Sequence, residues 1–180
     1  MKIDNKSIVP AAGGVVGQAG FSALIDTYTE QLYWHIRRMV VVHEDAQDIL
    51  QEMWIRAYRH IGSYKGSRAE IHSWLYKIAT NLCLRHLKRK YERRFIFFGD
   101  EKTNILDRFS ECISEPPDSV EARFQKALLS LPTKQRTVFN LRYYDELPYA
   151  EISRITGMSE TTLKTNYHYA QQRIKELMTR

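Results

Sequence analysis

Two stretches of helical hydrophobic periodicity, separated by an aperiodic acidic segment, constrain what this chain of 180 residues can fold into. Apolar residues recur every three or four positions from Phe21 to Lys90 and again from Leu131 to Met178, with no alternating strand pattern of useful length. A chain of this length forms one domain or two small ones. We therefore predict an all-α protein with two small helical domains joined by a flexible linker.

Charge and punctuation place the boundaries of these domains. Residues 91–118 carry a net charge of −3, whereas 1–90 and 119–180 carry +5 and +4. The acidic segment also contains the turn signals Gly99-Asp100 and Pro116-Pro117. We expect domains over 21–90 and 119–180, a linker over 91–118, and a flexible N-terminal arm over 1–20. A signal peptide is the alternative for the arm, but its apolar stretch is short and broken by glycines.

Composition excludes several classes of protein. No apolar run approaches the roughly 18 residues of a membrane-spanning helix, so we expect no membrane insertion. Cys83 and Cys112 form neither a disulfide framework nor a paired-cysteine zinc site, which favours a cytoplasmic location. The six histidines show no metal-binding spacing, and the chain has no phosphate-binding glycine loop or nucleophile elbow. We expect no enzyme, no cofactor and no metal.

A polar row follows the third predicted helix of the first domain, whose helices are expected over 21–41, 44–61 and 68–90. Trp74 and Leu75 are expected in the core. Cations that hold phosphates, beside rings that stack on unpaired bases, are typical of a single-stranded nucleic-acid site. A solvated helix face remains the alternative, and cations at a helix C-terminus also complement the helix dipole. The row, its basic continuation and the nearby loop comprise Tyr64, Lys65, Ser73, Trp74, Lys77, Asn81, Arg85, Lys88 and Arg89.

An acidic stripe distinguishes the second predicted helix. Asp45, Asp48 and Glu52 lie three and four residues apart, and Gln51 lies beside them. Acids at a helix N-terminus are favourable against the dipole in any case. Because an acidic face repels DNA, a protein is the expected partner if this stripe binds anything.

The C-terminal segment has the pattern of a helix-turn-helix. A short helix begins at Pro148 and ends near Ile155, Gly157 supplies a tight turn, and Ser159 caps a long helix. In DNA-binding proteins of this kind, the N-terminal residues of the second helix enter the major groove. An ordinary αα-hairpin is the alternative. The polar entry face comprises Ser159, Glu160, Thr161, Thr162, Lys164, Thr165 and His168.

In the order of its motifs, the chain resembles bacterial RNA polymerase sigma factors of the extracytoplasmic function group, within the sigma-70 family. Residues 45–52 and 54–58 resemble the family's core-binding segment, and 74–82 resemble its minus-10 helix. Leu131-Pro132, Arg136, 138–139, 141–143 and 149–164 resemble its minus-35 domain. Its recognition helix is less basic than is usual in the family, so fewer phosphate contacts are expected there.

The resemblance implies partners and roles. The acidic stripe would contact the clamp helices of the largest catalytic subunit of core RNA polymerase, and the flap would also be contacted. The loop from Ser63 to His72 and the helix bearing Asn81 would capture a flipped-out base of the minus-10 element. Arg136, Arg142 and Arg173 would position the minus-35 domain on promoter DNA. An anti-sigma factor is a further implied partner, and a DNA-binding regulator that does not join the polymerase is the alternative function.

Overall fold

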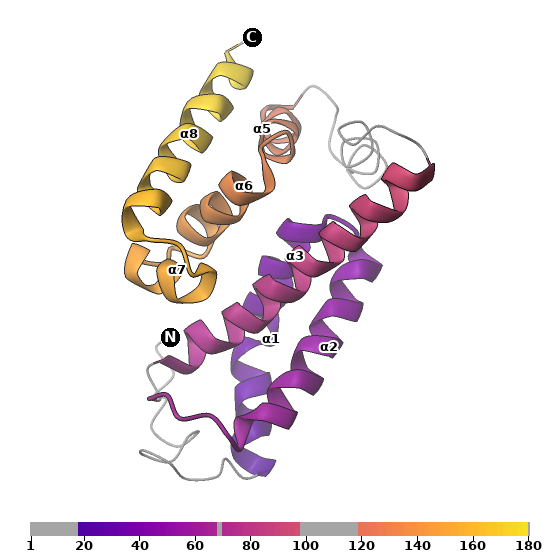
Figure 1. The fold of residues 1–180 in the computed structure, drawn as a ribbon, viewed down its shortest axis with the longest axis vertical. Helices are drawn as coiled ribbons and strands as arrows, with labels where there is room; N and C mark the ends of the chain where they lie inside the picture. Colours follow the sequence, from indigo (N-terminus) through magenta and orange to yellow (C-terminus); the bar gives the residue numbers. More distant parts are fainter. Residues whose placement is uncertain (1–17, 68–69, 98–118, 180) are drawn as a thin grey trace.

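The structure is a computed structural model that describes residues 18–67, 70–97 and 119–179, with the side chains of 18 and 91–97 not described. Within these ranges the chain is helical and contains no strand, which confirms the predicted all-α class. Three long helices lie together, and the C-terminal helices pack at one side of them (Figure 1). The predicted N-terminal arm lies almost wholly outside the described residues.

The N-terminal half consists of α1 (Gln18–Val40), α2 (His43–Ile61) and α3 (Ile71–Phe97). Each helix buries one apolar stripe against the other two, as at Leu32, Met53 and Leu75, which are all inaccessible to solvent. The helix α3 continues to Phe97, so the expectation that a linker begins at residue 91 is wrong for 91–97. The rest of the predicted linker, 98–118, lies outside the described residues.

The C-terminal half begins with α5 (Val120–Leu129), which sequence analysis did not predict. Ser119 caps this helix, since its side chain accepts a hydrogen bond from the amide of Ala122 at 3.1 Å. It is followed by α6 (Thr133–Phe139), a π-helical turn η3 (Asn140–Tyr144), α7 (Tyr149–Thr156) and α8 (Glu160–Met178).

One hydrophobic core joins the two halves. Leu141, Leu147 and Ile152 of the C-terminal half belong to the same buried cluster as Leu32 and Leu75 of the N-terminal half. The helix α7 packs against α3, and η3 packs against α1. A second, smaller core holds α5, α6 and α8 together. The two expected domains are therefore packed directly on one another in this structure.

The turn between α7 and α8 confirms the predicted helix-turn-helix. Gly157 has φ 75°, in the left-handed region that glycine adopts without strain, and its amide donates to the carbonyl of Ser153 at 2.8 Å. The hydroxyl of Ser153 also donates to the carbonyl of Met158 at 2.7 Å. The turn thus sets the angle at which α8 leaves α7.

Gly157→Ala should lower the free energy of unfolding by about 1–2 kcal/mol, because an L side chain is strained at positive φ. Gly62→Ala is the matched control: an added Cβ meets nothing within 4 Å at either glycine, but Gly62 has φ −66°. Alanine at Gly62 should be neutral or stabilising by up to about 1 kcal/mol. Urea denaturation measures both, and equal changes would show that backbone conformation does not decide the effect.

Candidate nucleic-acid and protein interfaces

A row of exposed polar side chains follows the outer face of α3, as predicted. The opposite face of the helix is buried at Leu75, Ala79 and Leu82, which fixes the direction in which the row points. Because its members lie three or four residues apart, they follow the helix axis at about 1.5 Å per residue. The exposed members are Lys77, Asn81, Arg85, Lys88 and Arg89.

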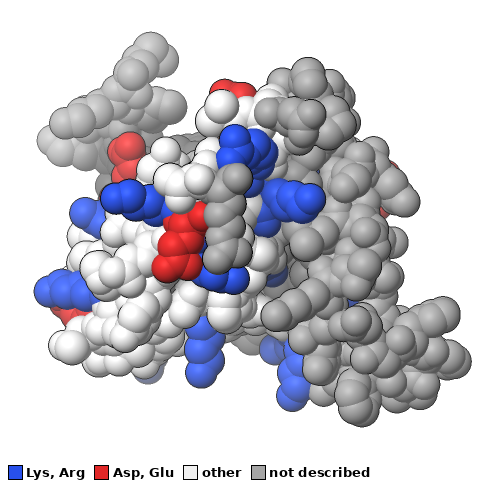
Figure 2. All heavy atoms as spheres, turned by 90° about the horizontal axis from the view of Figure 1, so that it is seen from above, with Lys and Arg blue, Asp and Glu red and all other residues white. Residues whose placement is uncertain are grey.

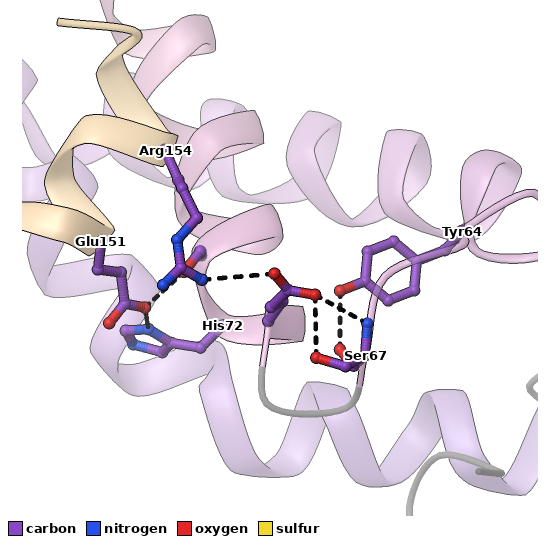
Figure 3. A network of polar contacts seen from close by, with 7 residues as sticks. Tyr64, Ser67, His72, Glu151 and Arg154 are labelled. Atoms are coloured by element: carbon purple, nitrogen blue, oxygen red, sulfur yellow. Dashed lines mark hydrogen bonds and ion pairs between the residues drawn. The ribbon is translucent and has the colours of Figure 1, made fainter. Parts of the chain in front are cut away.

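Ser73 does not belong to this exposed row, which corrects the prediction. It is 5% exposed, and its hydroxyl donates to Oε1 of Glu151 in α7 at 2.6 Å. Nδ1 of His72 lies 2.8 Å from the same oxygen. Ser73 and His72 therefore contact the C-terminal half, and Figure 3 shows Glu151 facing His72.

The loop before α3 is held closely around Tyr64. The ring of Tyr64 lies 5.0 Å from that of Trp74, and its hydroxyl donates to the carbonyl of Ser67 at 3.0 Å. A Cβ on Gly66 would lie 2.3 Å from this hydroxyl, so only glycine fits there without movement of the ring. Lys65 is exposed beside it. Trp74 is only partly buried, whereas it was expected in the core, so both rings of the pair remain partly accessible.

Glu70 connects this loop to the C-terminal half and was not singled out from the sequence. The amide and hydroxyl of Ser67 donate to its carboxylate at 3.0 and 2.9 Å, and these bonds hold the pKa of Glu70 below its usual value. Nη1 of Arg154 in α7 lies 3.5 Å from the other carboxylate oxygen (Figure 3). Sequence periodicity carries no signal for such a contact, because its partners are far apart along the chain.

The predicted entry face of α8 is exposed. Ser159 caps the helix and accepts from the amide of Thr162 at 3.2 Å, while Leu163, Ala170 and Ile174 bury the opposite face. Hydroxyl, amide and cationic groups at the start of such a helix are the types that meet base edges in a major groove. The exposed residues here are Ser159, Glu160, Thr161, Thr162, Lys164, Thr165, His168 and Arg173.

Two of the predicted cations lie over the same ring, that of Tyr149. The guanidinium of Arg142 lies 5.2 Å from the centroid of Tyr149, and Nζ of Lys164 lies 5.7 Å from it. Arg142 also donates to the carbonyl of Leu147 at 2.9 Å. A cation over an aromatic face is attracted electrostatically by the ring. The contacts connect the start of α7 to the exposed face of α8.

Arg136 is not a surface residue, which corrects its predicted role in positioning DNA. It is 2% exposed, and Nη1 donates to the carbonyl of Leu129 at 3.2 Å. Burial lowers the pKa of the guanidinium. Its function in this structure is to join the end of α5 to α6, because a buried cation needs a polar partner.

Fewer residues of the acidic stripe of α2 are exposed than predicted. Asp48 and Gln51 are exposed, whereas Asp45 and Glu52 are partly buried. Glu52 accepts from Nε of Arg56 at 3.0 Å, and Asp45 accepts from Nζ of Lys90 in α3 at 2.6 Å.

Exposed apolar side chains accompany the stripe on α2, since Ile55 and Tyr58 are 52% and 60% exposed. Sequence periodicity did not single these two residues out as exposed. Apolar and charged groups side by side on one helix are typical of a surface that binds protein.

Charge is mixed at the end of the molecule seen from above in Figure 2. Lys and Arg side chains lie around a small acidic group on the described part of this face.

No three His, Cys, Asp or Glu residues among those described are placed to hold a metal ion. The helices within the described ranges include none that is long and apolar enough to cross a membrane.

Family models match both halves of the chain. The model for sigma-70 region 2 matches residues 24–93, and that for sigma-70 region 4 matches 121–174. The ECF RNA polymerase sigma factor SigW of Bacillus subtilis is 32% identical over 167 residues, covering 88% of this chain and 89% of the relative. SigM of the same organism is 30% identical over 155 residues, covering 85% and 91%.

Solved structures share the fold. The sigma factor RpoE of Bartonella quintana, in complex with the anti-sigma factor NepR, has a TM-score of 0.64 at 20% identity, covering 88% of this chain and 96% of that one. CnrH, in complex with the cytosolic domain of CnrY, also has a TM-score of 0.64, at 18% identity, covering 91% and 90%. Both regions are present in order along one chain, and the identity to SigW extends over nearly the whole of it. The chain belongs to the ECF sigma factors of bacterial RNA polymerase.

Proposed function

We propose that this protein binds core RNA polymerase and directs transcription initiation at promoters with minus-35 and minus-10 elements. The observation that carries the proposal is the presence, in one chain, of two separate exposed polar faces on α3 and α8 within the two matched sigma-70 regions. A regulator that binds DNA alone would need only the second face. The relatives are sigma factors, and the chemistry of nucleotide addition belongs to the polymerase, so we propose no enzymatic activity for this chain.

The minus-10 element is proposed to bind α3 and the loop before it. Asn81 can donate and accept hydrogen bonds at a base edge, and Lys77, Arg85 and Lys88 carry the charges that hold a phosphate backbone. The Tyr64 and Trp74 rings offer a stacking surface for an unpaired base. Extruding a base costs a few kcal/mol, which stacking and hydrogen bonding offset.

The minus-35 element is proposed to bind as duplex to the N-terminal turns of α8. Lys164 and Thr165 are the expected base or phosphate contacts, and Arg142 and Arg173 provide further cations at the edges of this face. Arg136 is left out of this site because it is buried. The few cations on α8 favour a modest number of phosphate contacts, and therefore a shallow dependence of affinity on salt.

The polymerase is proposed to bind the exposed face of α2. Asp48, Gln51 and the exposed side of Glu52 lie on one helix with Ile55 and Tyr58. We propose the clamp helices of the core enzyme as their partner. The flap is a further proposed contact of the protein, and we propose a cytoplasmic location, where the polymerase acts. Both structural relatives are held by another protein, RpoE by the anti-sigma factor NepR. We propose that an anti-sigma factor also binds this chain.

Reconstituted transcription tests the function as a whole. Core RNA polymerase with this protein should initiate at discrete sites on fragments of the source genome, whereas either component alone should not. A protein that binds those fragments but never gives core-dependent initiation would support the alternative, a regulator outside the polymerase.

Asn81→Ala should impair promoter melting by about 1–3 kcal/mol, roughly 5- to 150-fold, because it removes the proposed hydrogen bonds to the extruded base. Permanganate footprinting of unpaired thymines in the complex with polymerase measures melting, and pull-down measures polymerase binding, which should not change. Gln31→Ala is the control, since it removes an exposed amide on α1. Equal melting by all three proteins would remove Asn81 from the site.

Charge reversal of Asp48 and Glu52 to lysine should weaken binding to core polymerase at least about tenfold, roughly 1.4 kcal/mol. The control reverses two exposed acids on other helices, Glu30 and Glu121, so that net charge is matched. Circular dichroism checks that all variants keep their helical content. If both double variants bind equally well, this face of α2 is an ordinary solvated surface.

A further inference from the structure

A buried carboxylate joins the two halves of the chain. Asp145 directly follows η3, and its side chain is 3% exposed. Its two oxygens contact different residues of α1: Oδ2 lies 2.8 Å from Nδ1 of His35, and Oδ1 accepts from Nη2 of Arg38 at 2.5 Å. His35 is itself inaccessible to solvent, and its Nε2 lies 3.0 Å from the hydroxyl of Thr80 in α3.

The backbone around Asp145 is shaped to reach this position. The π-helical turn inserts an extra residue before it, and the amide of Asp145 donates to the carbonyl of Asn140 at 3.2 Å. Glu146 follows at φ 53°, a conformation uncommon for residues other than glycine. The guanidinium of Arg38 also lies 4.7 Å from the ring of Tyr144 in η3. Local irregularity of this kind often accompanies a functional site.

A second carboxylate contact lies further along the same interface. Glu151 of α7 accepts from Ser73 and His72 of α3, and Arg154 pairs with Glu70 (Figure 3). Burial acts to raise the pKa of Glu151, but the bonds from Ser73 and His72 outweigh it and hold the pKa below its usual value. The carboxylate is therefore charged in the packed arrangement.

Polar contacts of this kind suit an interface that opens. Buried ion pairs add little net stability compared with apolar packing, but they are specific in geometry, and water can solvate both partners once they separate. Interfaces between domains of one chain resemble transient protein interfaces. The same interface also contains Leu141, Leu147 and Ile152, so the closed arrangement has an apolar contribution as well.

The closed arrangement does not fit promoter binding. The names of the two elements place them about 25 base pairs apart, roughly 85 Å of duplex at about 3.4 Å per base pair. The longest of the described helices, α3, has 27 residues and is about 40 Å long. Since α7 touches α3 and leads directly into α8, the two DNA-facing surfaces lie in one body too short to reach both elements. Ser73 and His72, at the start of the minus-10 helix, are also covered by Glu151.

We propose that Asp145 is a latch that holds the free protein in a closed state, which must open before both promoter elements can be bound. Its consequence for DNA rests on the proposed function, whereas the latch itself does not. Removing the carboxylate leaves His35 and Arg38 without a charged partner. This destabilises the closed state, where they are shielded from water, more than the open state, where water solvates them, so the equilibrium shifts toward the open state. A polymerase contact with the C-terminal half that only the open state permits would supply the free energy of opening in the wild-type protein.

Asp145→Asn tests the latch with the full-length protein in solution. Small-angle X-ray scattering should give a radius of gyration several ångström larger than that of the wild type. Glu146→Gln is the matched control, because it removes one carboxylate at the next, exposed position, and it should scatter like the wild type. An unchanged radius of gyration for Asp145→Asn, with helical circular dichroism retained, overturns the proposal.

If Asp145→Asn loses its helical signal, Arg38→Gln takes its place, since it removes the guanidinium that pairs with Oδ1 of Asp145 and leaves the carboxylate itself in the chain. A radius of gyration equal to that of the wild type overturns the proposal there as well. Binding of a fluorescent single-stranded oligodeoxynucleotide of random sequence gives a second readout. If the open state of the wild type is about one tenth populated, unlatching should tighten this binding by up to about tenfold.

The two proposals fail in different ways. Scattering involves neither DNA nor polymerase, so it tests the latch alone. If Asp145→Asn expands but the wild-type protein never supports initiation, the proposed function is contradicted and the latch is retained. A wild type that initiates transcription, with an Asp145→Asn variant that scatters identically, would overturn the latch and retain the function.

Discussion

The placement of one carboxylate, Asp145, between His35 and Arg38 is the constraint on which the arrangement of the two halves depends. A buried charge is costly unless its partners are in place, so η3 has to meet α1 in one register. That register brings α7 onto α3, where Glu151 meets Ser73 and His72. Apolar packing alone would allow one helix to shift along another. The carboxylate contacts do not allow such a shift, because it would separate the charged partners.

This arrangement connects the fold to the proposed function, because polar groups near the start of α3 contact Glu151 here and are proposed to contact DNA in an open chain. In the closed structure Ser73 donates to Glu151, and Tyr64 and Trp74 remain partly accessible beside it. In an open chain the same surface is available to a single strand of DNA. The exposed face of α2, where the polymerase is proposed to bind, lies outside the contact between the halves and would be accessible in either state. The proposed latch would hold such an initiation subunit in reserve until its partner is present.

Much of the fold followed from patterns within single helices. The stripe of α8, its Ser159 cap and the glycine turn before it could be recognised because each depends on residues only a few positions apart. Predictions failed where the partner lies outside the residue's own helix. Arg136 was assigned to the surface because it is charged, but it is buried and donates to the carbonyl of Leu129, at the end of a helix that sequence analysis did not predict. Ser73 lies in line with Lys77 and Asn81 along the sequence, but α7 covers it.

The sequence by itself determined the all-α class, the faces of α2, α3 and α8, and the family, because periodicity, caps and local motifs are short-range properties of the chain. Only the tertiary structure decided which polar residues stay exposed and how the halves meet. Asp145 lies 110 positions from His35 and 107 from Arg38, and nothing local to any of the three indicates the others. The free energy of a buried charge depends on partners that the fold brings to it from distant parts of the chain, and local sequence patterns carry no information about those partners.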